Sequence, residues 1–565
     1  MIRIGIDIGG TFTDFVVFHA DSQTVETFKL PSTPRDPAEA VLAGLTRLSE
    51  SSRRRIVHGS TVATNALLER KGAPTALIAT RGFRDILQIG RQNRPALYDF
   101  FADPPPPLVP EGWRLEVDER IDHRGEVLQP LDPTQIDSLM PFLQAEGVTS
   151  VAVSLLFSFL RPEHEQAIAG RLREAGFFVS ASHEVLPEFR EYERTSTTAI
   201  NAYVSPVIDR YLGRLEAALD RDDLRIMQSN GGSIGAGEAR RNGARCILSG
   251  PAGGAVGARY VAQMALIPPA SSAGEGLGAA CAPLCGVRAG VRAIAFDMGG
   301  TSTDVSLCEN DIRVTTEATI GGLPLRLPVI DIHTIGAGGG SIAMVDAGGA
   351  LRVGPQSAGA DPGPACYGRG EHPTVTDANL VLGRLVAENF LGGQMTLDAD
   401  RSWGALSRLG SAIGLSPVET ARGVIEVVNA HMERALRVIS VERGHDPRDF
   451  TLVSFGGAGG LHAADLARRL GIPRVLIPPL AATLSAFGML AADVIKDYSQ
   501  TVMLPGDTPL EALAARLSPL AERGMAEVMA EGVARDDIVV EQFLDIRYRG
   551  QSYELTVPFG PSVMA

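Results

Sequence analysis

The sequence is poor in aromatic residues and in cysteine, and each scarcity argues against a class of protein. Aromatic residues make up 5% of the 565 residues, whereas glycine occurs 62 times, a balance that favours an α/β protein over a β-sandwich. Five cysteines do not make a disulfide framework in so long a chain, and their odd number suits a reducing compartment. Cys281 and Cys285 have no second Cys or His pair nearby, so a zinc site is not favoured there.

Positive charge, long apolar runs and an export signal are also scarce. The formal net charge of −14 repels polyanions, so no nucleic-acid partner is expected. The longest apolar run, residues 151–160, is far shorter than the roughly 20 residues that span a bilayer. It is interpreted as a buried strand, and no membrane partner is expected. Because the N-terminus also lacks the pattern of a signal peptide, we expect a cytoplasmic protein whose partner is a small molecule.

The length is several times the roughly 150 residues of a typical domain, so two or three domains are expected. Helical spacing over residues 37–50 and 190–219 alternates with strand-like runs over 75–78 and 149–157, which predicts α/β patterning. We expect the helix over 190–219 to connect two lobes. The predicted division is an N-terminal lobe at 1–200, a second lobe at 201–500 and a partial C-terminal segment at 501–565.

What the sequence does contain is an eight-residue motif, Asp-x-Gly-Gly-Thr-x-Thr-Asp, in two copies at residues 7–14 and 297–304. Each copy follows a short apolar run and precedes another extended run, so each is predicted to be the loop of a β-hairpin. One copy alone could be an ordinary tight turn. Independent turns have no reason to share both aspartates and the threonine spacing, so two similar lobes are predicted.

The motif has the chemistry of a phosphate-binding loop. Paired glycines let backbone N–H groups approach phosphate oxygens, and threonine hydroxyls add neutral donors. Because a carboxylate repels phosphate, Asp7 and Asp297 are instead predicted to hold Mg²⁺, directly or through water. Neither copy has the Gly-Lys-Ser/Thr ending of a P-loop. The predicted phosphate-binding residues are Gly9, Gly10, Thr11 and Thr13 in the first copy and Gly299, Gly300, Thr301 and Thr303 in the second.

Two further glycine-rich segments occur. The segment FGGAGG at residues 455–460 follows a strand-like run and precedes a helix-like one, which suits adenosine or ribose at a helix N-terminus through Gly456, Gly457 and Gly459. In isolation, a close-packed turn explains it equally well. The segment LSGPAGGAVGA at residues 248–258 is compatible either with a turn that lines a nucleotide or with helix packing through small residues.

These motifs, together with others, follow an order that resembles the hydantoinase A/5-oxoprolinase family, and the resemblance covers nearly the whole chain. It implies a two-lobed α/β fold of the actin/sugar-kinase/Hsp70-like type with an ATP cleft between the lobes. The motifs that carry it are, in order, DIGGTFTD, HGSTVATNAL, REYERTSTT, SGPAGG, FDMGGTSTDV, DIHTIGAGGGSIA, ADPGPACYG, TDANLVLGRL, FGGAGGLHA and RYRGQSYEL.

The resemblance also implies a function. It suggests ATP-dependent hydrolysis of a cyclic amide such as hydantoin, N-methylhydantoin or 5-oxoproline, through phosphorylation of the amide oxygen. The chain would be the A subunit beside a hydantoinase B-type subunit, with ATP and Mg²⁺ as cofactors and with Asp7 and Asp297 as the catalytic residues. Other members are subunits of ATP-dependent ketone carboxylases, which leaves that activity open. A small-molecule kinase and a non-catalytic ATP-binding module are further alternatives.

An additional divalent metal is a weaker expectation. Asp331 and His333 stand two residues apart, on one side of a predicted strand, where they could bind a metal or position substrate. Asp361, Asp377 and His58 are candidate co-ligands, although a hydrogen-bonded structural role explains each of them equally well. His462, beside the third glycine loop, is expected to cap a helix or to pack.

Two departures from the family pattern are expected to matter. Family members continue past RYRGQSYEL with another folded segment, so this chain is interpreted as truncated at its C-terminus, with that segment missing or supplied elsewhere. A low-complexity, small-residue segment at residues 268–286 is interpreted as a flexible insertion before the second motif. Both departures leave open that this chain is a truncated family member without catalytic activity.

Overall fold

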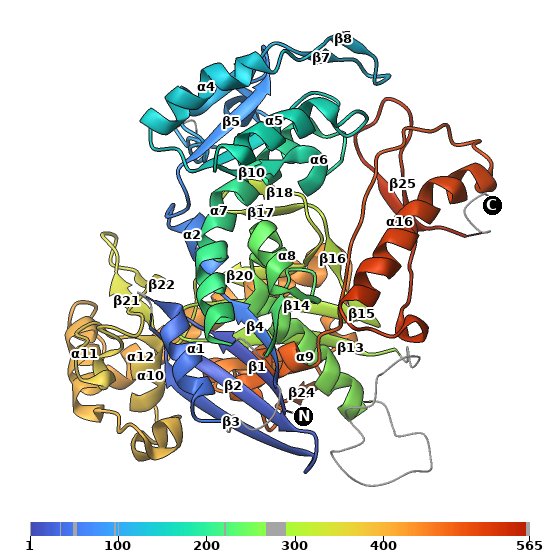
Figure 1. The fold of residues 1–565 in the computed structure, drawn as a ribbon. Helices are drawn as coiled ribbons and strands as arrows, with labels where there is room; N and C mark the ends of the chain where they lie inside the picture. The colour runs from blue at the N-terminus through green and yellow to red at the C-terminus, as the bar shows by residue number, and fades with distance from the viewer. Residues whose placement is uncertain are drawn as a thin grey trace.

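The computed structural model describes residues 2–33, 36–48, 54–94, 98–99, 101–219, 222–266 and 290–560. The expected insertion at 268–286, with Cys281 and Cys285, lies outside these residues. Two large sheets lie side by side in the lower half of the view in Figure 1, and a smaller α/β unit stands above the first of them.

The first large sheet carries the first octapeptide. Strand β1 pairs antiparallel with β2 and parallel with β4, and its alternating side chains Ile4 and Ile6 are buried with Phe15 in the core. The octapeptide connects β1 to β2 as a hairpin, as predicted. The strands, in sheet order, are β12 (Ser233–Gly235), β11 (Asp223–Met227), β4 (Arg54–Ser60), β1 (Ile2–Ile8), β2 (Phe12–His19) and β3 (Thr24–Pro31).

The second large sheet repeats this pattern around the second octapeptide. Strand β13 pairs antiparallel with β14 and parallel with β23, and β20 pairs with β14 as β3 pairs with β2. The predicted α/β fold class with two similar lobes is therefore confirmed. The strands are β15 (Asp311–Ile312), β14 (Thr303–Glu309), β13 (Arg292–Met298), β23 (Thr451–Phe455) and β24 (Arg474–Leu476), with β20 (Ile332–Ile335) paired to β14.

Helices α9 (Ser249–Leu266) and α15 (Leu484–Leu490) pack against each other and against strands of the large sheets. A Cβ on Gly488 would lie 1.9 Å from the carbonyl oxygen of Gly253, so the small residues let the two helix backbones touch. Within α9, the glycine-rich segment therefore serves helix packing, one of the two interpretations its sequence allowed.

The smaller α/β unit belongs to the N-terminal part of the chain. Its strands are β10 (Phe178–Ala181), β9 (Ser150–Ser154), β5 (Thr75–Thr80) and β6 (Arg114–Val117), covered by α4 (Thr134–Ala145) and α5 (Glu163–Glu174). Helix α7 (Glu191–Ala218) has the predicted bounds, but it runs from this unit to α1 (Pro37–Leu45), α2 (Val62–Leu68) and α8 (Ala236–Arg241) beside the first sheet, rather than between the lobes (Figure 1).

This course of α7 corrects the predicted division of the chain. The proposed boundary between residues 200 and 201 falls inside α7. Strands β11 and β12, which come after that boundary, complete the first large sheet. The first lobe therefore extends beyond residue 200, because α7 is a long internal helix of that lobe and not a linker.

Helices of the second lobe cover its sheet. Helix α12 (Pro417–Ile439) starts with a capping box between Ser416 and Glu419 and has proline in its first turn, two signals that fix a helix start. It presents Val424, Val428 and Met432 to the core at helical spacing. The other helices that contact it are α10 (Val375–Val381), α11 (Ala399–Ser411) and α14 (Ala463–Leu470).

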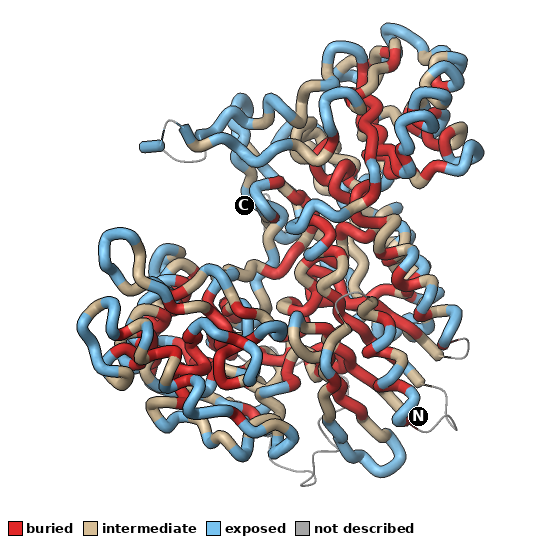
Figure 2. The backbone as a smooth tube through the Cα atoms, turned by 90° about the vertical axis from the view of Figure 1, so that its left-hand side faces the viewer, coloured by how far each residue is buried: buried red, intermediate tan, exposed pale blue. Residues whose placement is uncertain are grey.

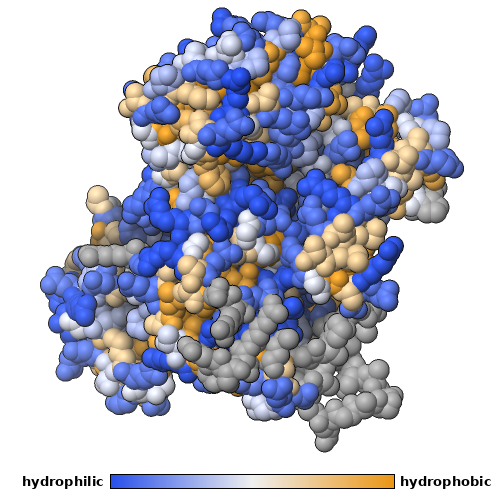
Figure 3. Space-filling view, viewed as in Figure 1, coloured by the Kyte–Doolittle hydropathy of each residue, from blue (hydrophilic) through white to orange (hydrophobic). Residues whose placement is uncertain are grey.

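The C-terminal segment is the least buried part of the described chain. It contains α16 (Leu510–Ala530) and a hairpin of β25 (Phe543–Ile546) and β26 (Leu555–Pro558), and Val528 is its buried apolar residue. Figure 2 shows this contrast with the red interiors of the lobes. In the view of Figure 3 its described surface mixes polar and apolar side chains. No helix of the described residues is long and apolar enough to cross a membrane.

Candidate functional site

The two octapeptides have the same backbone geometry. In the first hairpin Asp7 pairs with Asp14, and the N–H of Gly9 donates to the carbonyl oxygen of Phe12 at 2.9 Å. In the second hairpin Asp297 pairs with Asp304 in the same register, and a glycine N–H again closes the turn, at 3.1 Å. Each hairpin thus brings two carboxylates together at the end of its strands.

The two hairpins also face each other. The hydroxyl oxygen of Thr11 lies 3.5 Å from the position that a Cβ on Gly300 would take. The charge of Asp7 raises the pKa of Asp297, and the charges of Asp14 and Asp304 raise the pKa of both Asp7 and Asp297. Four carboxylates from two lobes therefore converge on one place, as expected if both copies form opposite walls of one site.

Burial and mutual repulsion raise the pKa of these carboxyls. Burial, followed by the charge of Asp14, raises the pKa of Asp7 to about 7. Burial and then the charges of Asp304 and Asp7 raise the pKa of Asp297 to about 8, while burial raises that of Asp304 to about 6. Such shifts mean that the ionised cluster lacks sufficient positive charge around it.

A divalent cation fits this arrangement. Oδ1 of Asp7 is buried and has no hydrogen-bond partner, which is costly for a carboxylate oxygen. Carboxylate oxygens are the ligands that Mg²⁺ prefers. The unpartnered oxygen suits one contact to a hard cation, and Asp7 and Asp297 are the residues predicted to hold it. The described carboxylates, however, do not form a group of three or more that is placed to hold a metal ion by itself.

The third glycine loop touches the second hairpin. The loop forms the short helix α13 (Gly456–Gly459) after β23. Gly456 has φ of +80°, and a Cβ there would lie 2.3 Å from Oδ1 of Asp297, so a side chain cannot fit without moving that carboxylate. The third glycine loop therefore lies directly against a carboxylate of the second octapeptide.

The glycine run at residues 336–340 supports the second hairpin from the side. The N–H groups of Gly339 and Gly340 donate to the carbonyl oxygens of Gly299 and Gly300 at 3.0 and 2.7 Å. A Cβ on Gly338 would come within 2.6 Å of the carbonyl carbon of Gly300. The run thus fixes the backbone of the second hairpin loop, a role that its sequence alone did not indicate.

The pair Asp331 and His333 has neighbours of its own. Asp331 forms ion pairs with Arg443 and, at 3.7 Å, with Arg313. Burial, and then Arg443, lowers the pKa of His333. The described residues contain no group of three or more His, Cys, Asp or Glu side chains placed to hold a metal ion. An additional metal at Asp331 and His333 stays a prediction, and the ion pairs give Asp331 another role.

Two candidate co-ligands are hydrogen-bonded parts of the fold. Asp377 closes the capping box of α10 with Thr374, and its carboxylate also accepts from two backbone N–H groups of the ADPGPACYG motif and from a serine hydroxyl. His58 is buried, with Nε2 2.6 Å from the Tyr211 hydroxyl, and burial lowers its pKa to about 4. Both side chains have full sets of partners and no capacity left for a metal.

Asp361 and His462 also make contacts other than with the four carboxylates of the hairpins. Asp361 is exposed and 3.6 Å from Arg369. His462 is buried with Nδ1 2.7 Å from Oδ1 of Asn429, and its side chain makes no capping bond to α14. Of the two roles expected for His462, packing is the one that the structure has.

Sequence reasoning missed several residues that contact the cluster. Lys29 on β3 donates to both carboxylate oxygens of Asp14, at 2.6 and 2.7 Å. The hydroxyl of Ser485 lies 3.4 Å from Asp297. Gly250, in the glycine-rich segment at residues 248–258 that the sequence did indicate, lies beside Asp7, since a Cβ there would come within 3.1 Å of the carboxylate. Neither Lys29 nor Ser485 belongs to a repeated motif with phosphate chemistry, and only the register of β2 with β3 could have indicated Lys29.

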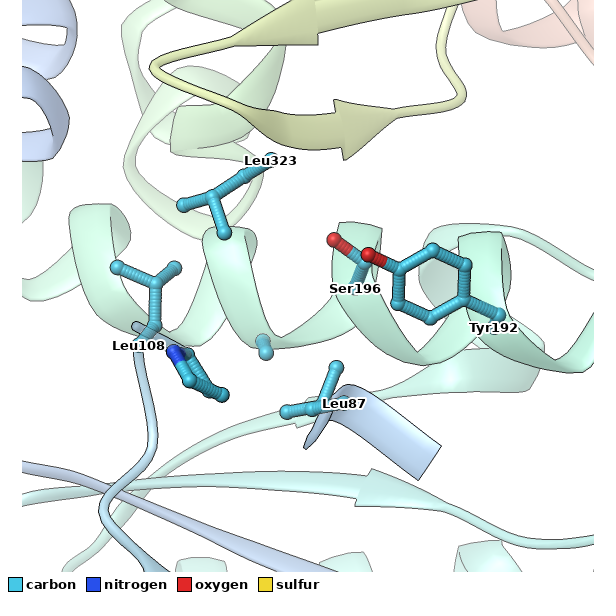
Figure 4. A pocket seen from close by; sticks show the side chains of 7 residues that line it. Leu87, Leu108, Tyr192, Ser196 and Leu323 are labelled. Atoms are coloured by element: carbon cyan, nitrogen blue, oxygen red, sulfur yellow. The ribbon is translucent and has the colours of Figure 1, made fainter. Parts of the chain in front are cut away.

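A small hollow lies elsewhere, beside α7. It has a cavity volume of about 10 Å³, which is room for about one water molecule. Figure 4 shows Leu87, Leu108, Leu323, Tyr192 and Ser196 around this hollow, which they line. Its lining contains no residue of the two octapeptides, and its size does not admit a ring substrate.

Comparison with known proteins identifies the family. The model for the N-terminal region of hydantoinase/oxoprolinase proteins matches residues 3–176, and the hydantoinase/oxoprolinase model matches residues 194–268 and 274–498. The chain belongs to the hydantoinase/oxoprolinase family. The two family models cover both hairpins and the third glycine loop.

Relatives within the hydantoinase/oxoprolinase family resemble the chain over nearly its whole length. The caprolactamase alpha subunit of Pseudomonas jessenii is 38% identical, over 98% of this chain and 80% of that one. The solved ATP-dependent caprolactamase of the same organism matches with a TM-score of 0.81 at 36% identity, over 99% and 81% of the two chains. The 5-oxoprolinase of Saccharomyces cerevisiae is 34% identical over 98% of this chain and 46% of its own length.

A carboxylase has the same architecture. A nucleotide-free structure of an acetone carboxylase, described as carrying out ATP-dependent acetone carboxylation, matches with a TM-score of 0.79 at 29% sequence identity. The match covers 98% of this chain and 80% of that one. The two-lobed arrangement therefore occurs in proteins of both activities.

Proposed function

We propose that this hydantoinase/oxoprolinase family member is an enzyme that hydrolyses a cyclic amide at the expense of ATP, as one subunit of a larger complex. The observation that carries the proposal is the convergence of Asp7 and Asp297, from two matching hairpins, on one carboxylate cluster flanked by the third glycine loop. The names of the caprolactamase and 5-oxoprolinase relatives supply the substrate class.

In this proposal the two hairpins bind the phosphates of one ATP molecule. The backbone N–H groups of Gly10 and Gly300, with the hydroxyls of Thr11 and Thr301, donate to phosphate oxygens without adding charge. Asp7 and Asp297 would hold Mg²⁺, which would neutralise charge on the transferred phosphoryl group. Gly456, Gly457 and Gly459 receive the nucleoside.

The chemical reason for using ATP is the poor reactivity of an amide. Transfer of the γ-phosphoryl group to the amide oxygen forms a P–O bond and releases ADP. Water then adds to the ring carbon, the ring C–N bond breaks and the nitrogen takes a proton. A second water then hydrolyses the resulting acyl phosphate, which releases phosphate and gives the carboxylate product. Phosphorylation thus makes the ring carbon more electrophilic toward the first water, and it gives the second water a good leaving group in the acyl phosphate.

Carboxylation of a ketone is the second candidate, because the acetone carboxylase structure has the same two-lobed architecture. Phosphorylation would then act on an enolate oxygen or on bicarbonate. The two candidates make opposite predictions about bicarbonate. A cyclic amidase needs none, whereas ATP turnover by a carboxylase depends on it.

The test is a substrate panel with the chain and a co-produced B-type subunit, which is the partner we propose. ADP and ring-opened product are measured together with 5-oxoproline, hydantoin, N-methylhydantoin and caprolactam, and with a ketone plus bicarbonate. The proposal expects equal amounts of ADP and ring-opened product with at least one cyclic amide and no need for bicarbonate. ATP turnover that no cyclic amide stimulates would contradict it.

A further inference from the structure

Lys29 is one of only three lysines in the chain, and it touches both lobes. From β3 of the first lobe, its Nζ donates to the two carboxylate oxygens of Asp14 and to the carbonyl oxygen of Ala482 at 2.7 Å. Ala482 lies in the 3-10 helix η8 (Ala481–Thr483), which contacts β23 and α13 of the second lobe. One side chain thus joins the first hairpin to the segment beside the third glycine loop.

The second hairpin has no such cation at the matching place. Lys29 stands directly opposite Asp14 across the strand pair β2 and β3. In the second lobe the residue opposite Asp304 is Thr334, whose hydroxyl donates to the Asp304 carboxylate. The two hairpins are therefore alike in backbone and carboxylates but differ in charge, and the difference resides in the third strand.

The contacts of Lys29 argue against a direct bond from its ammonium group to a phosphate oxygen. An ammonium group has three N–H donors, and the three acceptors of Lys29 are the two oxygens of Asp14 and the carbonyl oxygen of Ala482. No donor is left for a phosphate oxygen. Its charge acts on Asp7 directly, where it lowers the pKa, and it also pairs with Asp14, whose charge raises the pKa of Asp7.

We propose that Lys29 is a positioning residue for the ATP-dependent reaction, which holds the Asp14 carboxylate and ties the first hairpin to the second lobe while the nucleotide is bound. The inference rests on the proposed nucleotide site. Without Lys29, the Asp14 carboxylate has no counter-ion beside the other three, so the additional negative charge repels the nucleotide phosphates.

The test measures the affinity of the full chain for the Mg²⁺ complex of a non-hydrolysable ATP analogue by calorimetry. Lys29→Met is expected to weaken binding by about tenfold or more, because the Asp14 carboxylate, left without its counter-ion, repels the nucleotide phosphates. Adding Asp14→Asn to Lys29→Met is expected to restore most of the affinity, because it removes the unpaired charge. Lys29→Arg, which keeps the charge, is expected to lose less than Lys29→Met.

The matched control is Lys71→Met. Lys71 is exposed and pairs with the exposed Glu69 at 2.6 Å, so this change tests the loss of a lysine in general and is expected to leave binding unchanged. Melting temperatures without nucleotide show whether Lys29→Met folds. If it does not, the comparison of Lys29→Arg with the double variant carries the test.

Two results overturn the inference. Wild-type affinity in Lys29→Met means that Lys29 has no part in the site. A double variant as weak as Lys29→Met means that Lys29 itself contacts phosphate, since removal of Asp14's charge then brings no recovery. A wild-type chain that binds no nucleotide refutes the proposed site as well, whereas normal wild-type binding with unaffected Lys29→Met refutes this inference alone.

Discussion

Asp297 is the residue whose ionised form the site disfavours most, because burial and neighbouring carboxylates act in the same direction and raise its pKa to about 8. A carboxyl whose pKa is higher in the folded protein than in the unfolded one stabilises the fold fully below about pH 4. This contribution is lost as the pH rises through about 8. The site is therefore built at the expense of stability in neutral and alkaline solution.

Asp297→Asn should consequently separate stability from binding. Without ligands, the variant is expected to be more stable than the wild type at pH 9, by on the order of 1–3 kcal/mol, because asparagine cannot ionise. The gain should shrink as the pH falls and vanish near pH 4, where the carboxyl is protonated in both states. Thermal melts at both pH values, with and without Mg²⁺ and ATP, provide the measurement. A variant that melts below the wild type at pH 9, or that keeps the stabilisation by Mg²⁺ and ATP, contradicts the assignment.

A substitution at Gly456 tests whether this glycine packs against the Asp297 carboxylate. Gly456→Ala is expected to cost about 2–3 kcal/mol and to weaken nucleotide binding, because alanine is strained at positive φ and its Cβ would displace Asp297. Gly457→Ala is the stability control, since nothing lies within 4 Å of its Cβ position. Urea unfolding of both variants tests this, and equal stabilities would argue against the packing described.

For single residues, the sequence predicted those that both copies of the motif carry. It did not predict those whose role depends on which residue they face across a strand pair. Asp7 and Asp297 could be predicted because two copies of one motif carry them. Lys29 could not, since its role depends on facing Asp14 across β2 and β3. For Asp377 the sequence left a ligand role and a structural role equally open, and the capping box of α10 gives it the structural one.

Among the elements, α16 is held to the first lobe mainly by charge. Lys496, almost fully buried, pairs with Glu238 on α8 and with Glu531 at the end of α16, at 2.7 Å for the latter. Arg225 on β11 donates to Glu531 as well. Because α16 contributes little apolar burial, these ion pairs decide whether the helix stays in place.

Lys496→Met is therefore expected to release α16 rather than to unfold the lobes. The loss leaves partly buried carboxylates without a counter-ion, at a cost of about 1–3 kcal/mol. Limited digestion with chymotrypsin should cut the segment after residue 498 faster than in the wild type or in Lys71→Met, while the lobes stay resistant. Unchanged digestion would show that other contacts hold the helix.

Hairpins and helices that have a clear residue pattern could be predicted from the sequence. The way these elements are placed relative to one another could not. Both hairpins and the bounds of α7 follow from residue patterns. The place of α7 does not, because an amphipathic helix of that length is compatible with a link between lobes as well as with a course along one lobe. The predicted boundary at residue 200 failed for the same reason, since β11 returns to the first sheet through pairing with β4.

For the molecule as a whole, the two sheets and their hairpins are arranged as two copies of one unit around α9 and α15. This duplication leads to a specific expectation about the number of nucleotides that one chain binds. If the hairpins are the two walls of one site, neither can bind a nucleotide alone. If they are independent phosphate loops, the chain has two sites.

The most direct test of the account is the number of nucleotides bound per chain. Calorimetric titration with the Mg²⁺ complex of a non-hydrolysable ATP analogue should give one site in the wild type. Asp7→Asn and Asp297→Asn, although they lie in different lobes, should each abolish that same site with the fold intact. Two bound nucleotides per chain, or a single substitution that removes one of two sites, would contradict the central claim.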